Sequence, residues 1–427
     1  MKTIQTVAMA ATVALIPLAA SVSSAAAVDK SAVLETYADI AQAAYGDSLT
    51  TAQSLRQAVD SLIANPGEDT LAAAREAWIA ARVPYQQTEA YRFGNAIVDD
   101  WEGKVNAWPL DEGLIDYVEE ASYGSESDEN PIYTANVVAT EKLMVNGESV
   151  DASTITKALL AEVLHEAEAV EANVATGYHA IEFLLWGQDL NGTGAGAGNR
   201  PASDFSTQNC TGGNCERRAA YLKTATELLI DDLEEMAAAW GPGGEAREGL
   251  LSGDADAGLA TMLTGMGSLS YGELAGERIK LGLMLHDPEE EHDCFSDNTH
   301  NSHFYDQLGV MNVYLGSYKR VDGSVVKGAS LSDLVAAKDE AVDAEMKAKL
   351  EAAHAAMQAM VDRAEKVEAY DQMIGEGNAE GNAVVEAVVQ ALTDQTRSIE
   401  RVVATLDLSA IEFEGSDSLD NPQAVFQ

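Results

Sequence analysis

A histidine and a glutamate stand three positions apart in the segment Gly177-Tyr-His179-Ala-Ile-Glu182. On a helix, such residues lie about 60° apart around the axis and about 4.5 Å apart along it, so both side chains can reach one ligand. The imidazole and the carboxylate can therefore share a metal ion, and Gly177 leaves room for another helix or a ligand. The spacing by itself is more typical of a buried histidine hydrogen-bonded to its glutamate.

A second candidate lies earlier in the chain, where Arg75, Arg82 and Glu89 recur every seven residues beside Trp78 and Tyr85. Charges at the border of an apolar face are usually solvated or paired with each other. Helical bundles also deliver a metal ligand from a second helix through a glutamate in such a position. The spacing leaves both interpretations open, and Arg75 and Arg82 are candidates for binding an anionic group.

The densest set of candidate ligands is segment 286–303, which holds four of the seven histidines of the chain. Seven aspartate, glutamate or cysteine residues accompany them. We predict metal or ligand contact here, with His292, Asp293 and His300 as candidate residues, because solvation of a loop does not call for histidine. The alternative is a solvated polar loop between helices. Cys294 is expected to be a buried small residue rather than an accessible thiol.

Three familiar enzyme motifs are missing from the sequence. Segment 165–169 begins like the zinc motif H-E-x-x-H, but Ala169 occupies the place of the second histidine. The glycine-rich stretch 192–198 lacks the G-K-[ST] ending of a phosphate-binding loop. There is also no G-x-S-x-G nucleophile motif.

Apolar residues recur at helical spacing along most of the chain, and no alternating strand pattern persists, so we predict an all-α fold. Thr70 is expected to cap one long helix, in which Pro84 should produce a kink. The region 95–150 is expected to be irregular, with short helices. The other expected helices cover 32–45, 51–64, 153–186 with a break, 217–240, 245–265, 269–285, 331–374 in two pieces and 382–405.

These helices are expected to form two bundle domains. The N-terminal helical domain would cover 28–205 and carry the G-x-H-x-x-E motif. The C-terminal helical domain would cover 206–427 and carry the histidine-rich segment. A glycine-rich stretch and a cysteine loop separate them.

Residues 1–27 are typical of a secretory signal peptide, with Lys2 before an apolar stretch and small residues at the end. No later apolar run is long enough to span a bilayer, so we expect an exported protein without a transmembrane segment after signal removal. Cys210 and Cys215 flank a short glycine-containing loop, and in an oxidising compartment they are expected to form a disulfide.

The chain of 427 residues carries 70 acidic and 26 basic side chains, a formal net charge of -44. Binding to nucleic acid through a basic surface is excluded, because affinity for phosphate backbones comes from lysine and arginine. Such an acidic surface is suited to gathering cations, and equally to a salty habitat.

The stretch 171–190 resembles the G-x-H-x-x-E signature of the imelysin family. Segment 290–300 looks like the iron-regulated protein A branch of that family, and so do Trp78, Arg82, Glu89 and the Arg-Phe-Gly of 92–94. The resemblance spans essentially the whole mature chain, with its three segments in the expected order.

The resemblance implies a two-domain helical protein, exported to the periplasm or the outer surface of the outer membrane, whose expression is linked to iron supply. By similarity, the metal ligands would be His179 and Glu182, with Glu89 as a carboxylate from another helix. The expected ion is iron, in the ferric state that hard oxygen ligands favour, with zinc as the second choice. An iron-transport component is the expected partner.

Two other functions are compatible with the same residues. Family members have been labelled metallopeptidases, and a zinc peptidase would use His179, Glu182 and one histidine of segment 286–303. That chemistry requires an open metal position and a general base, which the sequence does not identify. The other function is binding of a non-metal ligand between the two domains, with His179 and Glu182 as structural hydrogen-bonding groups.

Overall fold

The computed structural model describes residues 29–409 and 411–426 of the chain. Helices dominate, which confirms the all-α prediction, and two short antiparallel hairpins complete the described ranges. One hairpin pairs β1 (Lys142–Val145) with β2 (Glu148–Asp151), and the other pairs β3 (Ser317–Lys319) with β4 (Val325–Lys327). The predicted signal peptide, residues 1–27, lies outside the described residues.

Four helices form what we call the first helical group: α1 (Lys30–Ala64), α2 (Glu68–Gln86), α6 (Gly177–Trp186) and α7 (Cys215–Ala239). Helix α1 packs against α2 and α7, and α6 packs against the same two helices. All ten residues of α6 are buried. A helix that is apolar on every side requires such complete covering, and here it forms the centre of the group.

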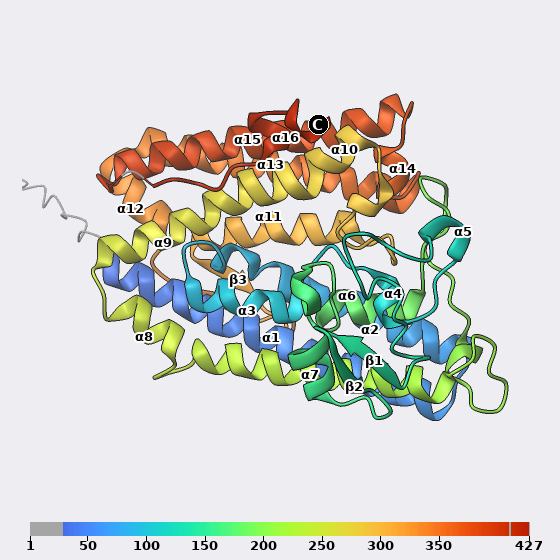
Figure 1. Ribbon diagram of the computed structural model, residues 1–427. Coiled ribbons are helices and arrows are strands. Elements are labelled where there is room, and N and C mark those ends of the chain that lie inside the picture. The colour runs from blue at the N-terminus through green and yellow to red at the C-terminus, as the bar shows by residue number, and fades with distance from the viewer. Residues whose placement is uncertain (1–28, 410, 427) are drawn as a thin grey trace, which may run out of the picture.

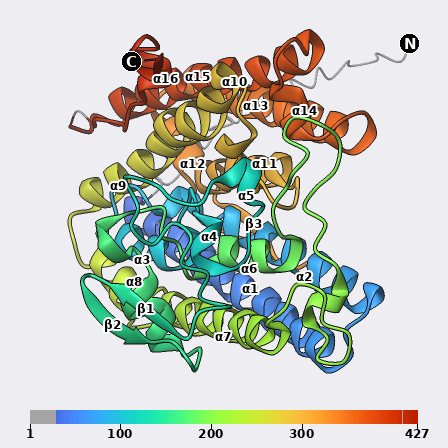
Figure 2. The same ribbon diagram turned by 45° about the vertical axis from the view of Figure 1, so that its right-hand side comes forward.

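The second helical group contains α11 (Thr299–Leu315), α13 (Glu340–Lys366), α15 (Ala379–Thr405) and a long rod. The rod consists of α9 (Ala255–Ser268), the π-helical stretch η5 (Leu269–Lys280) and α10 (Leu281–Leu285). Helix α15 packs against α13 and η5, while α11 packs against both α13 and α2. Figures 1 and 2 show α13 and α15 on one side of the molecule, α1 and α7 on the other, and α11 between them. Helix α11 therefore joins the two groups.

The remaining elements are short. The α-helices among them are α3 (Ala96–Asn106), α4 (Glu112–Ile115), α5 (Glu120–Tyr123), α8 (Glu245–Leu251), α12 (Leu331–Lys338), α14 (Tyr370–Ile374) and α16 (Asp417–Asp420). The 3-10 and π turns are η1 (Glu89–Tyr91), η2 (Leu159–Leu164), η3 (Ala167–Ala169), η4 (Ala202–Phe205), η6 (Pro288–Glu290) and η7 (Ala424–Phe426).

The division into domains at residues 205 and 206 stays a prediction. Helix α7 begins after that boundary, yet it packs against α1 and α6, which precede it. One hydrophobic core includes residues of both groups. The spatial grouping of the helices therefore differs from their order along the chain.

Helix α1 is continuous, so the expectation of two helices at 32–45 and 51–64 was wrong. The polar residues at its middle have partners that keep the helix intact. Ser48 donates its hydroxyl hydrogen to the carbonyl oxygen of Ala44 at 2.9 Å. The Asp47 carboxylate, 1% exposed, accepts hydrogen bonds from the Tyr318 hydroxyl at 3.0 Å and from Arg320 at 2.6 Å. A local sequence pattern does not show partners that are so distant in the chain.

Helix α2 ends at Gln86, so Pro84 lies in its last turn rather than at a kink. Its N-cap is Gly67, and Thr70 instead accepts a hydrogen bond from the Gly67 amide through its hydroxyl at 3.2 Å. Helix α11 covers 299–315. The last five residues of the histidine-rich segment 286–303 are therefore helical and do not belong to a loop. No helix in the described ranges is long and apolar enough to cross a membrane.

We predict that Asp47→Ala lowers the free energy of unfolding by about 2 kcal/mol, because it leaves the Arg320 guanidinium and the Tyr318 hydroxyl without their acceptor. Urea unfolding followed by circular dichroism measures the effect. Asp39→Ala is the matched control, since Asp39 is 53% exposed in its ion pair with Arg247. The control should lose about 0.5 kcal/mol or less. Equal losses in the two variants would contradict the anchoring role of Asp47.

Candidate metal centre

The start of α6 lies against the backbone of α3. Gly177 has a φ of +77°, and a Cβ atom at this position would lie 2.4 Å from the Val105 carbonyl oxygen. The preceding residue, Thr176, donates its hydroxyl hydrogen to the carbonyl oxygen of Lys104 at 2.9 Å. Gly177 therefore makes room for a neighbouring helix rather than for a ligand, and this close contact fixes the position of His179 two residues later.

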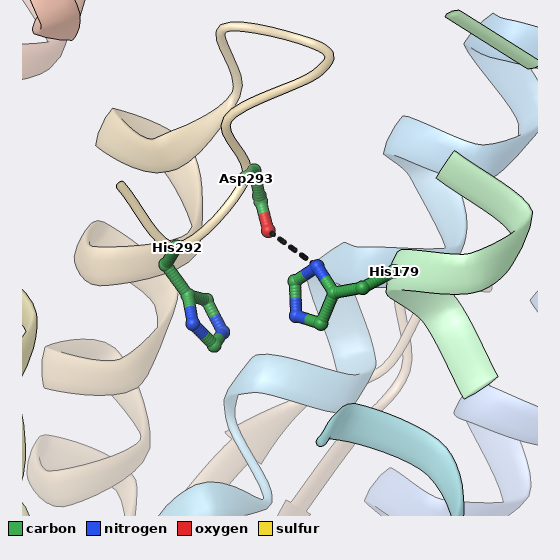
Figure 3. Close-up of side chains that lie close together, drawn as sticks. All are labelled: His179, His292 and Asp293. Carbon is green, nitrogen blue, oxygen red and sulfur yellow. Dashed lines mark ion pairs between the residues drawn. The ribbon is translucent and has the colours of Figure 1, made fainter. Parts of the chain in front are cut away.

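Three buried residues converge where the first turn of α6 faces the loop before α11. One nitrogen or oxygen atom from each of His179, His292 and Asp293 lies within 4.8 Å of the other two. Figure 3 shows His179 entering from α6 and the other two side chains entering from the opposite loop. Each side chain is at most 1% exposed. This cluster brings the G-x-H-x-x-E motif and the histidine-rich segment together in one candidate metal centre.

Glu182 lies behind His179. Its Oε2 atom is 3.0 Å from Nδ1 of His179, the contact expected for residues at i and i+3. Its Oε1 atom accepts hydrogen bonds from the backbone amide and the hydroxyl of Ser296 at 3.0 and 2.7 Å. When Nδ1 carries the hydrogen, Nε2 of His179 has a free lone pair, and this buried atom has no hydrogen-bond partner. A metal ion is a suitable partner for such an atom.

The Asp293 carboxylate is held by three donors. Arg82 donates to its Oδ1 atom at 3.0 Å, and the Asn298 amide donates to Oδ2 at 2.9 Å. The Ser302 hydroxyl also donates to Oδ2. These contacts orient the carboxylate next to His179, whose Nδ1 atom is 3.9 Å from Asp293 Oδ1.

His292 is buried without any hydrogen bond to its ring, since both Nδ1 and Nε2 have no partner. Its ring lies edge-on to that of His179 with the centroids 4.7 Å apart. On its other side it lies edge-on to Trp108, at 5.7 Å between centroids. The aromatic contacts fix the ring, while the nitrogen lone pair stays available to an ion.

Electrostatics keep both imidazoles neutral. Burial lowers the pKa of His179 well below its ordinary value, and the Arg82 and Arg278 guanidinium groups lower it further. Burial, followed by the charge of Arg278, has the same effect on the pKa of His292. Burial and the neighbouring Asp293 carboxylate raise the pKa of Glu182. Neutral imidazole is the form that binds metal, so these two histidines are already in the protonation state that a metal ion requires.

Glu89, expected as the third metal ligand, lies in η1 beyond the end of α2. Its carboxylate accepts a hydrogen bond from Arg278 at 2.7 Å, and it is not among the three clustered residues. Arg278 also donates to Asp306 at 3.2 Å and to Glu273 at 2.8 Å. Glu89 therefore belongs to a buried network around Arg278 that borders the candidate centre.

The other predicted site residues have separate positions. Arg75 donates to the carbonyl oxygen of Leu185 in the last turn of α6 and to that of Arg200 in the loop that follows, so it satisfies backbone groups. His300 lies on α11, 9% exposed, outside the three-residue cluster. Cys210 and Cys215 form the predicted disulfide. Cys294 is a half-buried free thiol whose pKa is raised by burial.

The sequence does not single out Asp306 or Arg278 of this region, and it offers His303 only as one of the four histidines of segment 286–303. His303 is fully buried, its two ring nitrogens have no partner, and its centroid is 6.3 Å from that of His292. A signal was present, because His303 and Asp306 repeat the spacing of His179 and Glu182. Arg278 gave no such signal, since two of its acidic partners, Glu89 and Asp306, come from distant segments.

Comparison with known proteins identifies the family of this chain. Residues 41–399 match the sequence profile of imelysin. This match covers most of the chain, which therefore belongs to the imelysin family.

Two individual proteins are similar to this chain. Over 60 residues it is 38% identical to iron-regulated protein A of Synechococcus elongatus, a match that spans 14% of this chain and 17% of that relative's length. The crystal structure of a Parabacteroides distasonis protein, described as an iron-regulated protein A precursor, aligns with a TM-score of 0.63 and 20% identity. The alignment covers 90% of this chain and 97% of the other. At that identity the likeness establishes the fold.

We predict that Gly177→Ala destabilises the protein more than an alanine at a comparable glycine with free space around it. Gly377→Ala is the matched control, because Gly377 has a φ of +83° and nothing within 4 Å of its Cβ position. Backbone strain alone should cost about 1 kcal/mol in the control. Overlap with the Val105 carbonyl should bring the loss in Gly177→Ala to about 3 kcal/mol or more in urea unfolding. Equal losses of unfolding free energy in the two variants would show that the backbone of α3 shifts to accommodate the added methyl group at no cost.

The buried histidines predict a specific pH dependence of stability. Burial and the charge of Arg278 lower the pKa of His303 well below its ordinary value, so the folded protein keeps this ring neutral. In the unfolded chain it takes up a proton below a pH of about 6.5. Stability from this group is therefore present above that pH and is lost as the pH falls below it.

His303→Gln removes this effect. Between a pH of about 7 and about 5.5, the parent should lose about 1 kcal/mol more unfolding free energy than the variant. Urea unfolding at both pH values, with a chelator present, measures the difference. Equal losses in parent and variant would mean that His303 is already protonated in the folded protein.

Proposed function

We propose that this imelysin is an exported iron-binding protein of iron acquisition, with His179, His292 and Asp293 as the metal ligands. The observation that carries the proposal is a set of buried imidazole nitrogens without hydrogen-bond partners beside an oriented carboxylate. Burying such atoms without a partner costs about 1–3 kcal/mol each. Binding of a cation would remove that cost, so the residues present fit a metal ion.

The donor set favours a divalent first-row ion. Two imidazoles and one carboxylate are the donors of non-haem ferrous sites, and they also suit zinc. In this arrangement Glu182 orients His179 rather than binding the ion, which is the usual role of a carboxylate behind a metal-bound histidine. We therefore propose ferrous iron here, in place of the ferric ion expected from a set richer in oxygen ligands.

The buried position of the cluster favours holding an ion over hydrolysing a peptide. A peptidase centre needs a position open to substrate and a free general base. All three candidate ligands are at most 1% exposed, and the nearby Glu182 is already bonded to His179 and Ser296. Zinc peptidase activity is thus the second candidate, and the metal test below separates the two.

The proposed location is the periplasm or the outer surface of the outer membrane. The Cys210–Cys215 disulfide suits an oxidising compartment. In that location the protein would receive iron before transport and pass it to an iron-transport component.

Elemental analysis of tag-free protein tests the proposal. We expect about one iron per chain in the parent and at least a tenfold weaker affinity in His179→Ala/His292→Ala, which removes two ligands. His354→Ala is the matched control, because His354 lies outside the cluster and contacts Gln307. Zinc in the same pattern would support the peptidase instead. No metal in parent or variants, even after incubation with both ions, would leave only binding of a non-metal ligand.

Two single variants test which carboxylate matters. Glu182→Gln should weaken iron affinity about 10- to 100-fold, because it leaves one acceptor oxygen for three donors, the His179 ring and the amide and hydroxyl of Ser296. Glu89→Gln should leave iron bound, since its carboxylate is engaged with Arg278. Loss of iron in Glu89→Gln with retention in Glu182→Gln would instead support the ligand set implied by family resemblance.

A further inference from the structure

A cleft of about 500 Å³ includes His292 of the candidate metal centre in its wall. We call it the access cleft. Its outer wall includes Glu166 and Glu171, and its inner wall includes Asn106, Arg278 and His292. The cleft therefore contains one of the three proposed ligands in its wall.

The inner wall of the access cleft and the candidate centre share His292. His292 is 1% exposed, has both ring nitrogens without a partner, and lies against His179. Asn106, 2% exposed, has an amide nitrogen without a partner, and its Oδ1 atom accepts a hydrogen bond from Arg82 at 2.6 Å. Arg82 in turn holds Asp293. Two unsatisfied polar side chains thus mark the path from the cleft to the proposed ligands.

Carboxyl groups outnumber guanidinium groups in the wall of the access cleft. The basic groups are Arg92 and Arg278, and both are engaged by acidic partners. The acidic groups are Asp99, Glu102, Glu166, Glu171, Glu273 and Glu277. Among these, Glu166, Glu171 and Glu277 form no ion pair with the lysines and arginines of the described residues. The negative charge at the mouth is thus uncompensated.

A larger cleft of about 700 Å³ lies nearby, lined by Trp108, Glu112, Asp189 and Cys294 among others. It is also acidic, but none of the three proposed ligands lies in its wall. Among the clefts described for residues 29–409 and 411–426, the access cleft is the one that His292 lines.

We infer that the access cleft is the route by which the ion reaches the centre, and that the ion arrives as a hydrated divalent cation rather than as an anionic chelate. This inference rests on the proposed function. A cleft with an excess of negative charge focuses the electric field, so it concentrates cations and raises their association rate about 10-fold or more at low salt. The same field repels complexes with citrate or other polycarboxylates.

Stopped-flow loading of Co²⁺ into metal-free protein, followed by its visible absorbance, tests this route. In about 20 mM NaCl, Glu166→Gln/Glu171→Gln should load about 3- to 10-fold more slowly than the parent, because two charges at the mouth are lost. In about 300 mM NaCl the difference should nearly vanish, since salt screens the field. The final amount bound should be unchanged, because neither residue belongs to the centre.

Glu376→Gln/Glu400→Gln is the matched control. It removes the same charge from exposed positions outside the access cleft and should load at the parental rate. In the parent, Co²⁺ supplied as its citrate complex should load more slowly than free Co²⁺. In Glu166→Gln/Glu171→Gln the difference between these two loading rates should be smaller.

Each outcome has a separate meaning. Full loading with equal rates in parent and cleft variant at low salt would overturn the access route. Loading of the citrate complex as fast as free Co²⁺ would overturn the preference for a bare cation. A parent that binds no Co²⁺ at equilibrium would refute the proposed function, and this inference with it. The end point thus distinguishes failure of the site from failure of the route.

Discussion

The candidate centre depends on the complete burial of α6. Helices α2, α3 and α7 pack against it, and all ten of its residues are buried. Burial of an imidazole and a carboxylate in such a helix requires partners from the protein itself. Ser296 supplies them for Glu182, whereas Nε2 of His179 has none. The same packing that stabilises the first helical group therefore leaves a lone pair available for an ion.

Two buried arginines have opposite effects on this centre. Arg82 holds Asp293 beside His179, and Arg278 holds Glu89 and Asp306 at its border. Their positive charges oppose the binding of a cation. The same charges help to keep the nearby imidazoles unprotonated, and a protonated imidazole cannot bind metal at all. The two arginines therefore hold the surrounding carboxylates in place and at the same time keep His179 and His292 in the neutral form.

The sequence predicted those parts of the molecule that depend on local pattern. The helix expected at 382–405 is α15, because its amphipathic spacing and flanking glycines are local signals. The prediction of His179, His292 and Asp293 as candidate ligands rested on their residue types and on the clustering of histidines in segment 286–303. Local pattern did not show that α2 ends before Glu89, which depends on packing at its last turn. It also did not distinguish His303 from the other histidines of segment 286–303, because the importance of His303 comes from burial beside a ring that lies 11 residues earlier.

The ligands of the proposed site come from both helical groups, which has a thermodynamic consequence. His179 belongs to the first group, while His292 and Asp293 belong to the loop that leads into α11 of the second. An ion bound by all three cross-links the groups, so its binding energy contributes to holding them together. By reciprocity, any partner that separates the groups weakens the hold on the ion by the same free energy. At the proposed site, separation of the two groups would therefore weaken ion binding without any change in the ligands themselves.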